Sequence, residues 1–493
     1  MLTDCFKTNI VFFINFFLFL NFNFLNISAN AHELPNIGDP SQTTLSPQQE
    51  VELGQEYFAM LSKQLDFESS PYINEYVQNL GNSLVHPEDN PDKFEYKFYV
   101  LRDDAINAFA IPGGIVAINT GMILATESES ELASVIAHEI THVSQKHACR
   151  SIASHNKIMA ARLAGILASA LISSKNPNAG SAAMAAAIGG STQAILSFSR
   201  KNEQEADSLG MLKVYKSGYD VHSVPSFLQK LQVKFQHKNA TMPEYLRTHP
   251  LTNSRVTKAK ARAMKYAYKQ VVSSLDYHIA KSMVEVNKLG ANKKTTKHFE
   301  SKYKNGTFAN ELEVKHSLAL ALKNQNEFNK AHSIFEELSF KYPDNYILKL
   351  ETAKIEQILN KTKIAEKRIL SAFIEHPENI NVALTYSEAL LANKEKESAK
   401  TAIKILNKQN PKTPKGEIKK IYALKAKAYS NVGDKFNSFL SEADYLISNQ
   451  MLFGALKKLE LAKKTVKEGT SMHNVALNRI DKLNKIIKVK FPE

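Results

Sequence analysis

The chain of 493 residues carries 63 Lys and Arg against 49 Asp and Glu, a formal net charge of +14. Its 43% hydrophobic and 23% charged residues exclude a disordered chain and a polytopic membrane protein, and its two cysteines exclude a disulfide scaffold. The charge is unevenly spread, because residues 251–493 carry a net +20 whereas residues 1–250 carry −6. This division predicts two functional units, as does a length beyond the roughly 250–300 residues of a single core.

Residues 1–31 are predicted to be a cleavable signal peptide. An apolar run at Ile10–Leu20 precedes the small-x-small site Ala29-Asn30-Ala31. The alternative is an uncleaved membrane anchor, but this run is short beside the about 20 residues that a span needs. We therefore expect cleavage after Ala31 and export to a periplasm. Because Cys5 would leave with the signal, Cys149 would be the only remaining thiol, and no internal disulfide could form.

Residues 32–270 are predicted to form one domain that mixes helices with a small sheet. The expected elements are helices at 51–61 and 72–84, a half-buried strand at 94–100, and two extended segments within 105–123. The strand is predicted because aromatic and charged residues alternate in Phe94–Val100. The extended segments are separated by a turn signal at Pro112-Gly113-Gly114. From Ser130 onward the pattern is helical.

The strongest local motif is His138-Glu139-Ile140-Thr141-His142, within the helical segment that follows Ser130. On a helix, two histidines four residues apart share one face and can both bind one Zn²⁺. The carboxylate of Glu139 lies where it can act on a water beside the metal. The alternative is a helix whose histidines are ordinary polar groups. We interpret the motif as a metal site.

A third ligand is needed, and an extended H-E-x-x-H-x-x-G-x-x-H pattern does not supply it. That pattern requires Gly at 145 and His at 148, where this chain has Gln145 and Ala148. His147 falls one residue short, so we expect it at the surface or beside a ligand. The extended pattern is therefore excluded, and the third ligand is expected from a later helix.

The later candidates lie in the helical segment Ser199–Asp207. Glu203 and Asp207 are four residues apart and share a helix face, so one can bind metal while the other orients a ligand or donates a proton. Glu205 is expected to point into solvent. The preceding apolar stretch, residues 158–190, is interrupted at Ser173–Gly180, and neither half is long enough to span a membrane. Buried or interfacial helices, with at most peripheral membrane contact, are therefore expected.

The basic part of the chain carries an internal repeat. Two residue types recur at intervals of 34 residues: Ala331, Ala365 and Ala399, and Pro343, Pro377 and Pro411. A small residue at a helix crossing and a proline after the second helix, at this period, are typical of tetratricopeptide repeats. Residues 271–493 are therefore predicted to form an all-α solenoid, with a further unit near Gly433 and Ser438.

The helix with H-E-x-x-H, followed about sixty residues later by Ser199-Arg200-x-x-Glu203-x-x-Ala206-Asp207, resembles the gluzincin peptidases that include the CAAX prenyl protease. With the export signal and repeats, the resemblance covers nearly the whole mature chain. It implies a mainly α protein, with an α+β zincin-type metalloprotease domain containing a small sheet, followed by the tetratricopeptide solenoid. It also implies one Zn²⁺ per chain, with Glu203 as third ligand and Asp207 as a neighbouring group or proton donor.

Two further segments gain a role only from this resemblance. Asn107-Ala108-Phe109-Ala110 matches the edge strand whose backbone pairs with an extended peptide substrate, although its composition predicts only a hairpin. Thr248-His249-Pro250 matches a segment whose histidine can occupy the open zinc position and keep the enzyme latent. The alternatives for His249 are an aid to the transition state or an incidental loop histidine.

The resemblance implies a periplasmic zinc endopeptidase that degrades misassembled or unfolded outer-membrane proteins and assists the assembly of their barrels. Glu139 would be the general base. The alternatives are a non-proteolytic periplasmic chaperone or assembly adaptor with a structural zinc site, and an integral membrane protease. The basic repeats are expected to be solvated helix faces or a docking surface for the outer-membrane barrel assembly machinery. Nucleic acid is not an expected partner, because the charge is spread over helices of an exported chain.

Overall fold

The computed structural model describes residues 45–87, 90, 93–151, 177–235, 243–392, 394–409 and 415–490. Residues from Pro47 to Glu493 belong to one compact unit. The predicted signal peptide, residues 158–176 of the apolar stretch, and Pro411 lie outside the described residues. None of the described helices is both long and apolar enough to cross a membrane.

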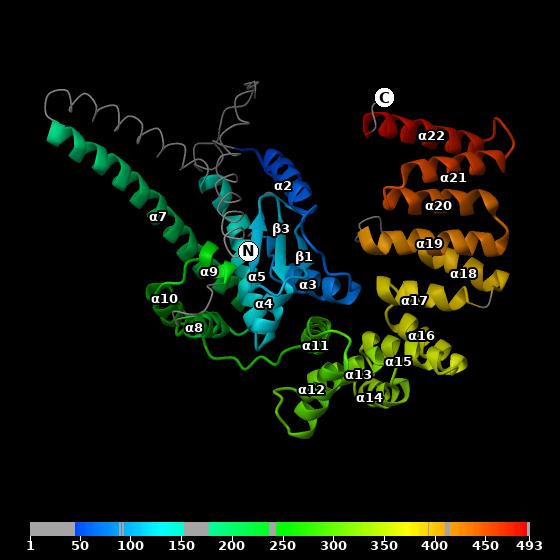
Figure 1. Ribbon diagram of the computed structural model, residues 1–493, viewed down its shortest axis with the longest axis horizontal. Coiled ribbons are helices and arrows are strands. Elements are labelled where there is room, and N and C mark those ends of the chain that lie inside the picture. The colour runs from blue at the N-terminus through cyan, green and yellow to red at the C-terminus, as the bar shows by residue number, and fades with distance from the viewer. Residues whose placement is uncertain are drawn as a thin grey trace. The chain divides into compact units, whose positions relative to one another are not determined.

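The first part of the described chain contains a small sheet among helices (Figure 1). Its elements are α2 (Pro47–Leu61), α3 (Pro71–Ser83), β1 (Lys97–Leu101), β2 (Ala108–Ile111), β3 (Ile115–Asn119), α4 (Thr120–Ala125), α5 (Glu129–Ser144), α7 (Pro177–Lys216), α8 (Ser223–Phe235), α9 (Glu244–Thr248) and α10 (Asn253–Ala263). The predicted helices at 51–61 and 72–84 are confirmed as α2 and α3, and the predicted strand is β1. The predicted α+β fold class of this part is therefore confirmed.

The sheet has the strand order β1-β3-β2. β1 runs parallel to the central β3, and β2 runs antiparallel to it. The turn between β2 and β3 is possible because Gly113 and Gly114 adopt φ values of 79° and 93°, which side chains other than glycine rarely allow. Among the described residues β2 pairs only with β3, so it forms one edge of the sheet.

The prediction of an extended segment up to residue 123 is wrong at its C-terminal end. Residues 120–123 were expected to be extended, but they belong to α4. Met122 and Ile123 are fully buried, and a short apolar run does not distinguish a buried strand from a buried helix. The side chain of Thr120 donates a hydrogen bond of 2.9 Å to the carbonyl of Asp103, which holds the start of this helix against the loop after β1.

Helices α5 and α7 pack closely, which brings the two sequence motifs together. Gly210 of α7 makes this approach possible, because a Cβ atom there would lie only 3.2 Å from the backbone nitrogen of His138. Ala206, one turn earlier, is fully buried. Small residues at these two positions allow α7 to lie against the face of α5 that carries the histidines. Helix packing therefore brings the residues of the two motifs to one place.

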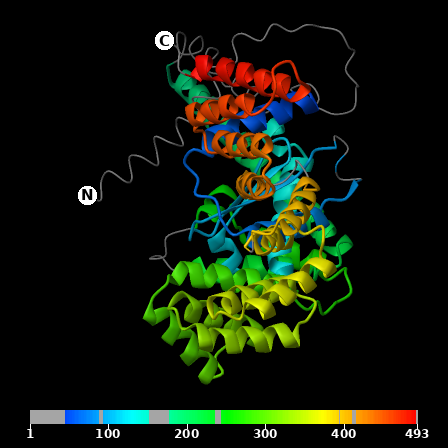
Figure 2. The same cartoon turned by 90° about the vertical axis from the view of Figure 1, so that its right-hand side faces the viewer.

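The second part of the chain consists of consecutive helices, coloured from green to red in Figures 1 and 2. They are α11 (Leu275–Leu289), α12 (Lys293–Lys304), α13 (Glu311–Asn324), α14 (Phe328–Lys341), α15 (Tyr346–Ile358), α16 (Thr362–Glu375), α17 (Ile380–Leu390), α18 (Lys396–Asn407), α19 (Lys415–Val432), α20 (Lys435–Ser448), α21 (Leu452–Lys464) and α22 (Ser471–Lys490). Figure 2 shows them stacked as neighbouring pairs. The prediction of an all-α repeat region is confirmed.

The 34-residue interval corresponds to buried positions in successive helix pairs. The three repeated alanines lie in α14, α16 and α18 and are all fully buried. Pro343 and Pro377 each lie two residues after the last residue of their helix, where a missing N–H does no harm. In the 34-residue period, the alanines therefore mark the buried positions within the helices, and the prolines mark the helix ends.

The hydrophobic core continues from the sheet region into the first repeat helices. Tyr277 of α11 donates a hydrogen bond of 3.0 Å to the carbonyl of Thr126, and Lys281 reaches the same oxygen at 2.7 Å. The carboxylate of Glu129, at the start of α5, accepts hydrogen bonds from the backbone and the hydroxyl of Ser274. The predicted boundary at residues 270 and 271 thus lies next to a shared core, and the three-domain division remains a prediction.

Candidate metal centre and catalytic site

The two motif histidines of α5 point to one side of the helix. The Nε2 atoms of His138 and His142 lie 3.0 Å apart, as their spacing of four residues predicts. The helix begins at a side-chain cap, because Ser128 accepts a hydrogen bond from the backbone of Glu131. Glu139 is buried beside these histidines, with 1% of its surface exposed.

Glu203 of α7 faces the histidine pair. Its carboxylate oxygens lie 3.5 Å from Nε2 of His138 and 3.4 Å from Nε2 of His142. His249, directly after α9, brings its Nδ1 atom to 3.0 Å from Glu203 and 3.4 Å from His138. One ligand atom from each of these four residues lies within 4.8 Å of the others. Chain segments more than a hundred residues apart therefore meet at one point.

The donors at this point suit a divalent cation such as zinc. Imidazole nitrogens and a carboxylate oxygen are its usual ligands in catalytic sites, which combine three protein ligands with one open position. In addition, Oε1 of Glu139 is buried without a hydrogen-bond partner, and Nε2 of His249 lies 3.6 Å from it. A buried carboxylate oxygen without a partner is costly unless a ligand or a cation compensates it. The residues present therefore fit a catalytic metal.

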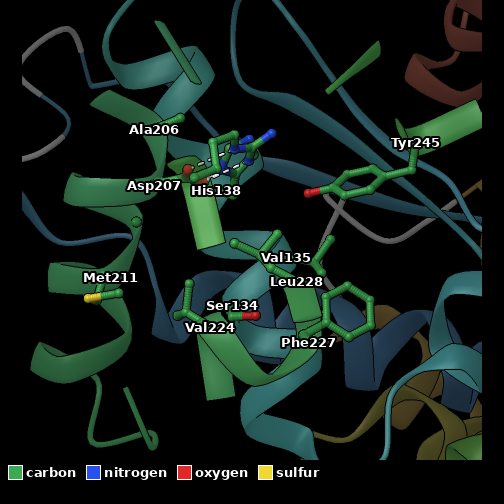
Figure 3. Close-up of a pocket in the computed structure, with 12 residues that line it drawn as sticks. Ser134, Val135, His138, Ala206, Asp207, Met211, Val224, Phe227, Leu228 and Tyr245 are labelled. Atoms are coloured by element: carbon green, nitrogen blue, oxygen red, sulfur yellow. Dashed lines mark hydrogen bonds and ion pairs between the residues drawn. The ribbon is translucent and has the colours of Figure 1, made fainter. Parts of the chain in front are cut away.

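Asp207 lies on the outer side of His138. Its Oδ1 atom is 3.2 Å from Nδ1 of His138, so that ring can present Nε2 to a metal. Figure 3 shows the two side chains meeting, beside the apolar side chains of Val135, Phe227 and Leu228. The small cavity drawn there, about 20 Å³, has room for roughly one water molecule.

Arg255 of α10 holds both carboxylates of α7. It donates two hydrogen bonds of 2.8 Å to Asp207, and its Nη1 atom lies 2.8 Å from Oε2 of Glu203. All three side chains are at least nine-tenths buried. A planar guanidinium can bridge two carboxylates in this way, whereas a lysine presents a single charged point. The sequence motif identifies Glu203 and Asp207. The structure shows in addition that both carboxylates contact the positively charged side chain of Arg255.

The other outer side of the site contains His147. Its Nδ1 atom lies 2.9 Å from Nδ1 of His142, and its Nε2 atom lies 3.2 Å from Glu205. The expectation that Glu205 points freely into solvent is wrong, because its carboxylate also accepts a hydrogen bond of 3.1 Å from Arg150. The expectation was wrong because the chain turns back after α5 and brings His147 and Arg150 to the face of α7 that carries Glu205.

Burial and charge shift the pKa values of these groups in opposite directions. Burial raises the pKa of Glu139 above its ordinary value and lowers the pKa of His142 well below its own, so His142 stays neutral, as a metal ligand must be. Burial alone would raise the pKa of Glu203, but hydrogen bonds with His138 and His249 hold it well below the ordinary range. Burial would lower the pKa of His138, yet Asp207 and Glu203 raise it to about 10. Carboxylates that stabilise a proton on His138 would also stabilise a divalent cation there.

His249 is fixed by its own short helix. Its backbone N–H donates a hydrogen bond of 2.8 Å to the carbonyl of Tyr245, and the two rings lie 4.8 Å apart. The backbone N–H of Tyr245 in turn donates to the carbonyl of Ile106 at 3.3 Å. The segment that carries His249 is therefore attached to the chain immediately before β2.

The predicted substrate segment lies at the edge of the sheet next to the cluster. Ala108–Ala110 belong to β2, and the carbonyl of Asn107 accepts a hydrogen bond of 3.0 Å from the backbone of Asn119. A cleft of about 310 Å³ runs from this edge to the cluster. It is lined by Glu50, Phe109–Pro112, Glu139, His142, Val143, Lys146–Ala148, Ser151, Ser199, Asn202, Glu203, Thr248 and His249.

Two residues that reach the ligands were not assigned a clear role from the sequence. Arg255 follows Thr248-His249-Pro250 at a fixed short distance, but no spacing rule connects it to α7. His147 was expected at the surface or beside a ligand, and the structure places it beside His142. Buried arginines are rarely found without carboxylate partners. This general rule is the one consideration that could have suggested an ion pair between Arg255 and the carboxylates of α7.

A cluster of two histidines and a glutamate, with a buried glutamate beside it, on packed helices next to a sheet edge defines a metallopeptidase. The model of peptidase family M48 matches residues 71–263. The chain is 31% identical over 458 residues to the beta-barrel assembly-enhancing protease of Yersinia pestis, covering 92% of each chain. It is 32% identical over 344 residues to the protein of that name from Escherichia coli K12, covering 70% of each. The chain belongs to peptidase family M48 and is a metalloendopeptidase.

More distant relatives match a smaller share of the chain. The human mitochondrial metalloendopeptidase OMA1 is 25% identical over 229 residues, covering 41% of this chain and 42% of that one. Among solved structures, the chain is similar to the crystal structure of yeast Tom70. The alignment covers 93% of this chain and 77% of the Tom70 chain, with 12% identity and a TM-score of 0.29.

Proposed function

We propose that the protein is a zinc-dependent endopeptidase of the periplasm that degrades misassembled or unfolded outer-membrane proteins and assists the assembly of their barrels. The observation that carries the proposal is the convergence of His138, His142 and Glu203 beside the buried carboxylate of Glu139. The name of the similar proteases, which cover most of this chain, supports the substrate class.

His138, His142 and Glu203 would hold the metal. When bound, Zn²⁺ would polarise the peptide carbonyl and make an adjacent water more acidic. Asp207 keeps the proton of His138 on Nδ1, so that Nε2 is free to bind. Because His138 and Arg255 hold its pKa below the ordinary value despite burial, Asp207 stays ionised, and we propose that it orients His138 instead of donating a proton.

Glu139 acts as the general base. Its buried carboxylate lies in the cleft, where it takes a proton from the attacking water and passes it to the leaving amine. Burial raises its pKa above the ordinary value, which makes it a better base than an exposed glutamate would be. No other carboxylate of the described residues that line this cleft is both next to the histidine pair and free of Arg255.

We propose that His249 is a latch. With Nδ1 at 3.0 Å from Glu203 and 3.4 Å from His138, it occupies the position that a fourth ligand would take. A catalytic zinc site needs this position for water or substrate. The imidazole would therefore leave before hydrolysis begins, and replacement of His249 by alanine should raise the rate of proteolysis. A lower rate in that variant would instead assign His249 to transition-state stabilisation.

Substrate recognition is proposed to use backbone pairing at β2. An extended peptide can add to a sheet edge through main-chain hydrogen bonds, which favours unfolded strands over folded ones. The hydrogen bond from Tyr245 to Ile106 places the segment of His249 next to the start of this edge. The stacked helices α11–α22 are proposed to dock on the outer-membrane barrel assembly machinery.

The test is digestion of an unfolded outer-membrane barrel protein by the full chain, with the same protein in folded form as the comparison. Wild type should cleave the unfolded form and spare the folded one. Glu139→Gln should bind zinc and cleave neither, with a rate loss of about 10²–10⁴ because the general base is absent. Equal cleavage by wild type and Glu139→Gln would refute the proposed mechanism. Wild type that binds zinc and promotes barrel assembly without cleavage would favour the adaptor hypothesis.

A further inference from the structure

The two histidines of the cluster are supported from outside in different ways. His138 has a carboxylate directly behind it, since its Nδ1 atom lies 3.2 Å from Asp207. His142 has another imidazole behind it, since its Nδ1 atom lies 2.9 Å from Nδ1 of His147. The support of His142 therefore depends on which nitrogen of His147 carries the proton.

The hydrogen bonds around these rings agree with only one arrangement of protons when His142 binds a metal. Its Nε2 atom faces the cluster, so its proton lies on Nδ1 and is donated to Nδ1 of His147. His147 then carries its own proton on Nε2, which lies 3.2 Å from Oε2 of Glu205. A carboxylate at that position favours this proton location, because a carboxylate accepts hydrogen bonds and cannot donate one when ionised.

The backbone after α5 is shaped to make this contact. Helix α5 ends at Ser144, and Lys146 adopts a φ of 51° in the left-handed region, which few residues other than glycine enter. The turn redirects the chain, so that the ring of His147 comes back toward His142 and is 3% exposed. Arg150, one turn further on, donates a hydrogen bond of 3.1 Å to the same oxygen of Glu205.

We propose that His147 and Glu205 are positioning residues for the metal, which act through His142. The chain of contacts runs from His142 to His147, then to Glu205 and Arg150, and it fixes both the orientation and the proton position of the ligand ring. The proposal rests on the proposed function, because it needs His142 to be a metal ligand. Outer partners of ligating histidines typically contribute 10- to 100-fold to metal affinity.

The test measures zinc affinity of the full chain by competition with a chromophoric chelator. His147→Ala should lower the affinity by roughly 10- to 100-fold. Glu205→Ala should lower it less, because water can accept the proton of His147 in place of the carboxylate. Glu205→Gln should lie between Glu205→Ala and wild type, since its amide oxygen still accepts a hydrogen bond. Gln204→Ala, at the neighbouring and likewise half-buried position of α7, is the matched control and should bind zinc as wild type does, because Gln204 contacts Lys258 and not the cluster.

A purely structural role would reduce stability without changing the affinity of the folded molecules. The Glu205 side chain is one-third exposed, so its variants should fold even if His147→Ala does not. The absorption spectrum of the Co²⁺-loaded protein gives a second readout, and it should shift in Glu205→Ala relative to Gln204→Ala. Zinc affinity and spectrum unchanged in both Glu205 variants would overturn the proposal.

The two proposals fail in different ways. Unchanged zinc affinity in the Glu205 variants, together with loss of cleavage in Glu139→Gln, would refute the positioning role and leave the peptidase mechanism intact. Weakened zinc binding in these variants, together with full cleavage by Glu139→Gln, would refute the mechanism and leave the positioning role intact.

Discussion

Buried charged side chains are arranged differently in the site and in the repeats. In the site, His138, His142, Glu203 and His249 direct ligand atoms at one shared point. In the repeats, buried carboxylates have their own cations, and Glu356 also lies with His332 and Glu336 in a second group of possible ligands. Glu351 lies between Lys323 at 2.5 Å and Lys354 at 2.9 Å, and Glu356 lies 2.7 Å from Arg368. These two lysines hold the pKa of Glu351 at about 2 despite burial, which alone would raise it.

The difference separates a chemical role from a structural one. A paired buried carboxylate joins two helices and can be replaced together with its partner by apolar side chains. A group of convergent ligands cannot be replaced in this way, because its members serve a bound species as well as the fold. The pair of Glu203 and Asp207 combines both patterns, since Arg255 neutralises their charge while Glu203 still faces the histidines.

The largest stability effect is expected at Arg255. Arg255→Met leaves Asp207 and Glu203 buried without their cation, which should cost about 3–5 kcal/mol of unfolding free energy. Arg255→Lys keeps the charge but not the two-point contact with Asp207, so its loss should be smaller. Urea unfolding of the metal-free chains measures both. A loss for Arg255→Met no larger than for Arg255→Lys would show that a positive charge alone does not stabilise the two carboxylates, and would contradict this account.

In the repeats, removing one partner should be costly but repairable. Arg368→Met leaves the fully buried Glu356 without its cation and should destabilise the chain by about 3–5 kcal/mol. The double variant with Glu356→Met should recover most of that loss, and peptide hydrolysis per folded molecule should match wild type in both. Altered hydrolysis in the stable double variant would contradict a purely structural role for this pair.

The close approach of α5 and α7 can be tested through Gly210. Gly210→Val places atoms against the backbone of His138 and should cost about 1–3 kcal/mol through overpacking, with weaker zinc binding as α7 moves away. Gly454→Val in α21 is the control, because a Cβ atom there meets its nearest neighbour at an ordinary 3.5 Å. Isothermal titration calorimetry with zinc should give a lower zinc affinity for Gly210→Val than for Gly454→Val. Equal zinc affinity in both variants would show that the helix spacing does not set the site.

The remaining expected effect is a pH dependence from His316 of α13. Burial lowers its pKa to about 4, and its Nδ1 atom lies 2.6 Å from the hydroxyl of Ser282. The unfolded chain takes up a proton near pH 6.5 and the folded chain does not, so the contribution of His316 is present above pH 6.5 and is lost as the pH falls toward 4. The loss should approach about 3 kcal/mol. Urea unfolding between pH 7 and 4.5 should show a shallower decline for His316→Gln, and parallel declines would contradict this assignment.

Much of the fold could be predicted because short-range patterns determine it. The spacing of four residues places His138 beside His142, and the 34-residue interval identifies the buried alanines of the repeats. The helix at Thr120–Ala125 could not be distinguished from a strand, because it has only 6 residues and most of them are buried. A position of His147 beside a ligand was one of the two alternatives from the sequence, but its contact with Glu205 could not be predicted, because it depends on a left-handed turn at Lys146 that no residue type signals.

The most direct test of the metallopeptidase mechanism compares zinc content and cleavage in Glu139→Gln and Glu203→Gln. Both substitutions remove one buried carboxylate of the same cluster, but only Glu203 is assigned to the metal. Zinc per chain, measured by elemental analysis after dialysis, should remain near that of wild type in Glu139→Gln and fall sharply in Glu203→Gln, with cleavage lost in both. Loss of zinc in Glu139→Gln, or cleavage of an unfolded barrel protein by it at the wild-type rate, would contradict the assignment of Glu139 as base and Glu203 as ligand.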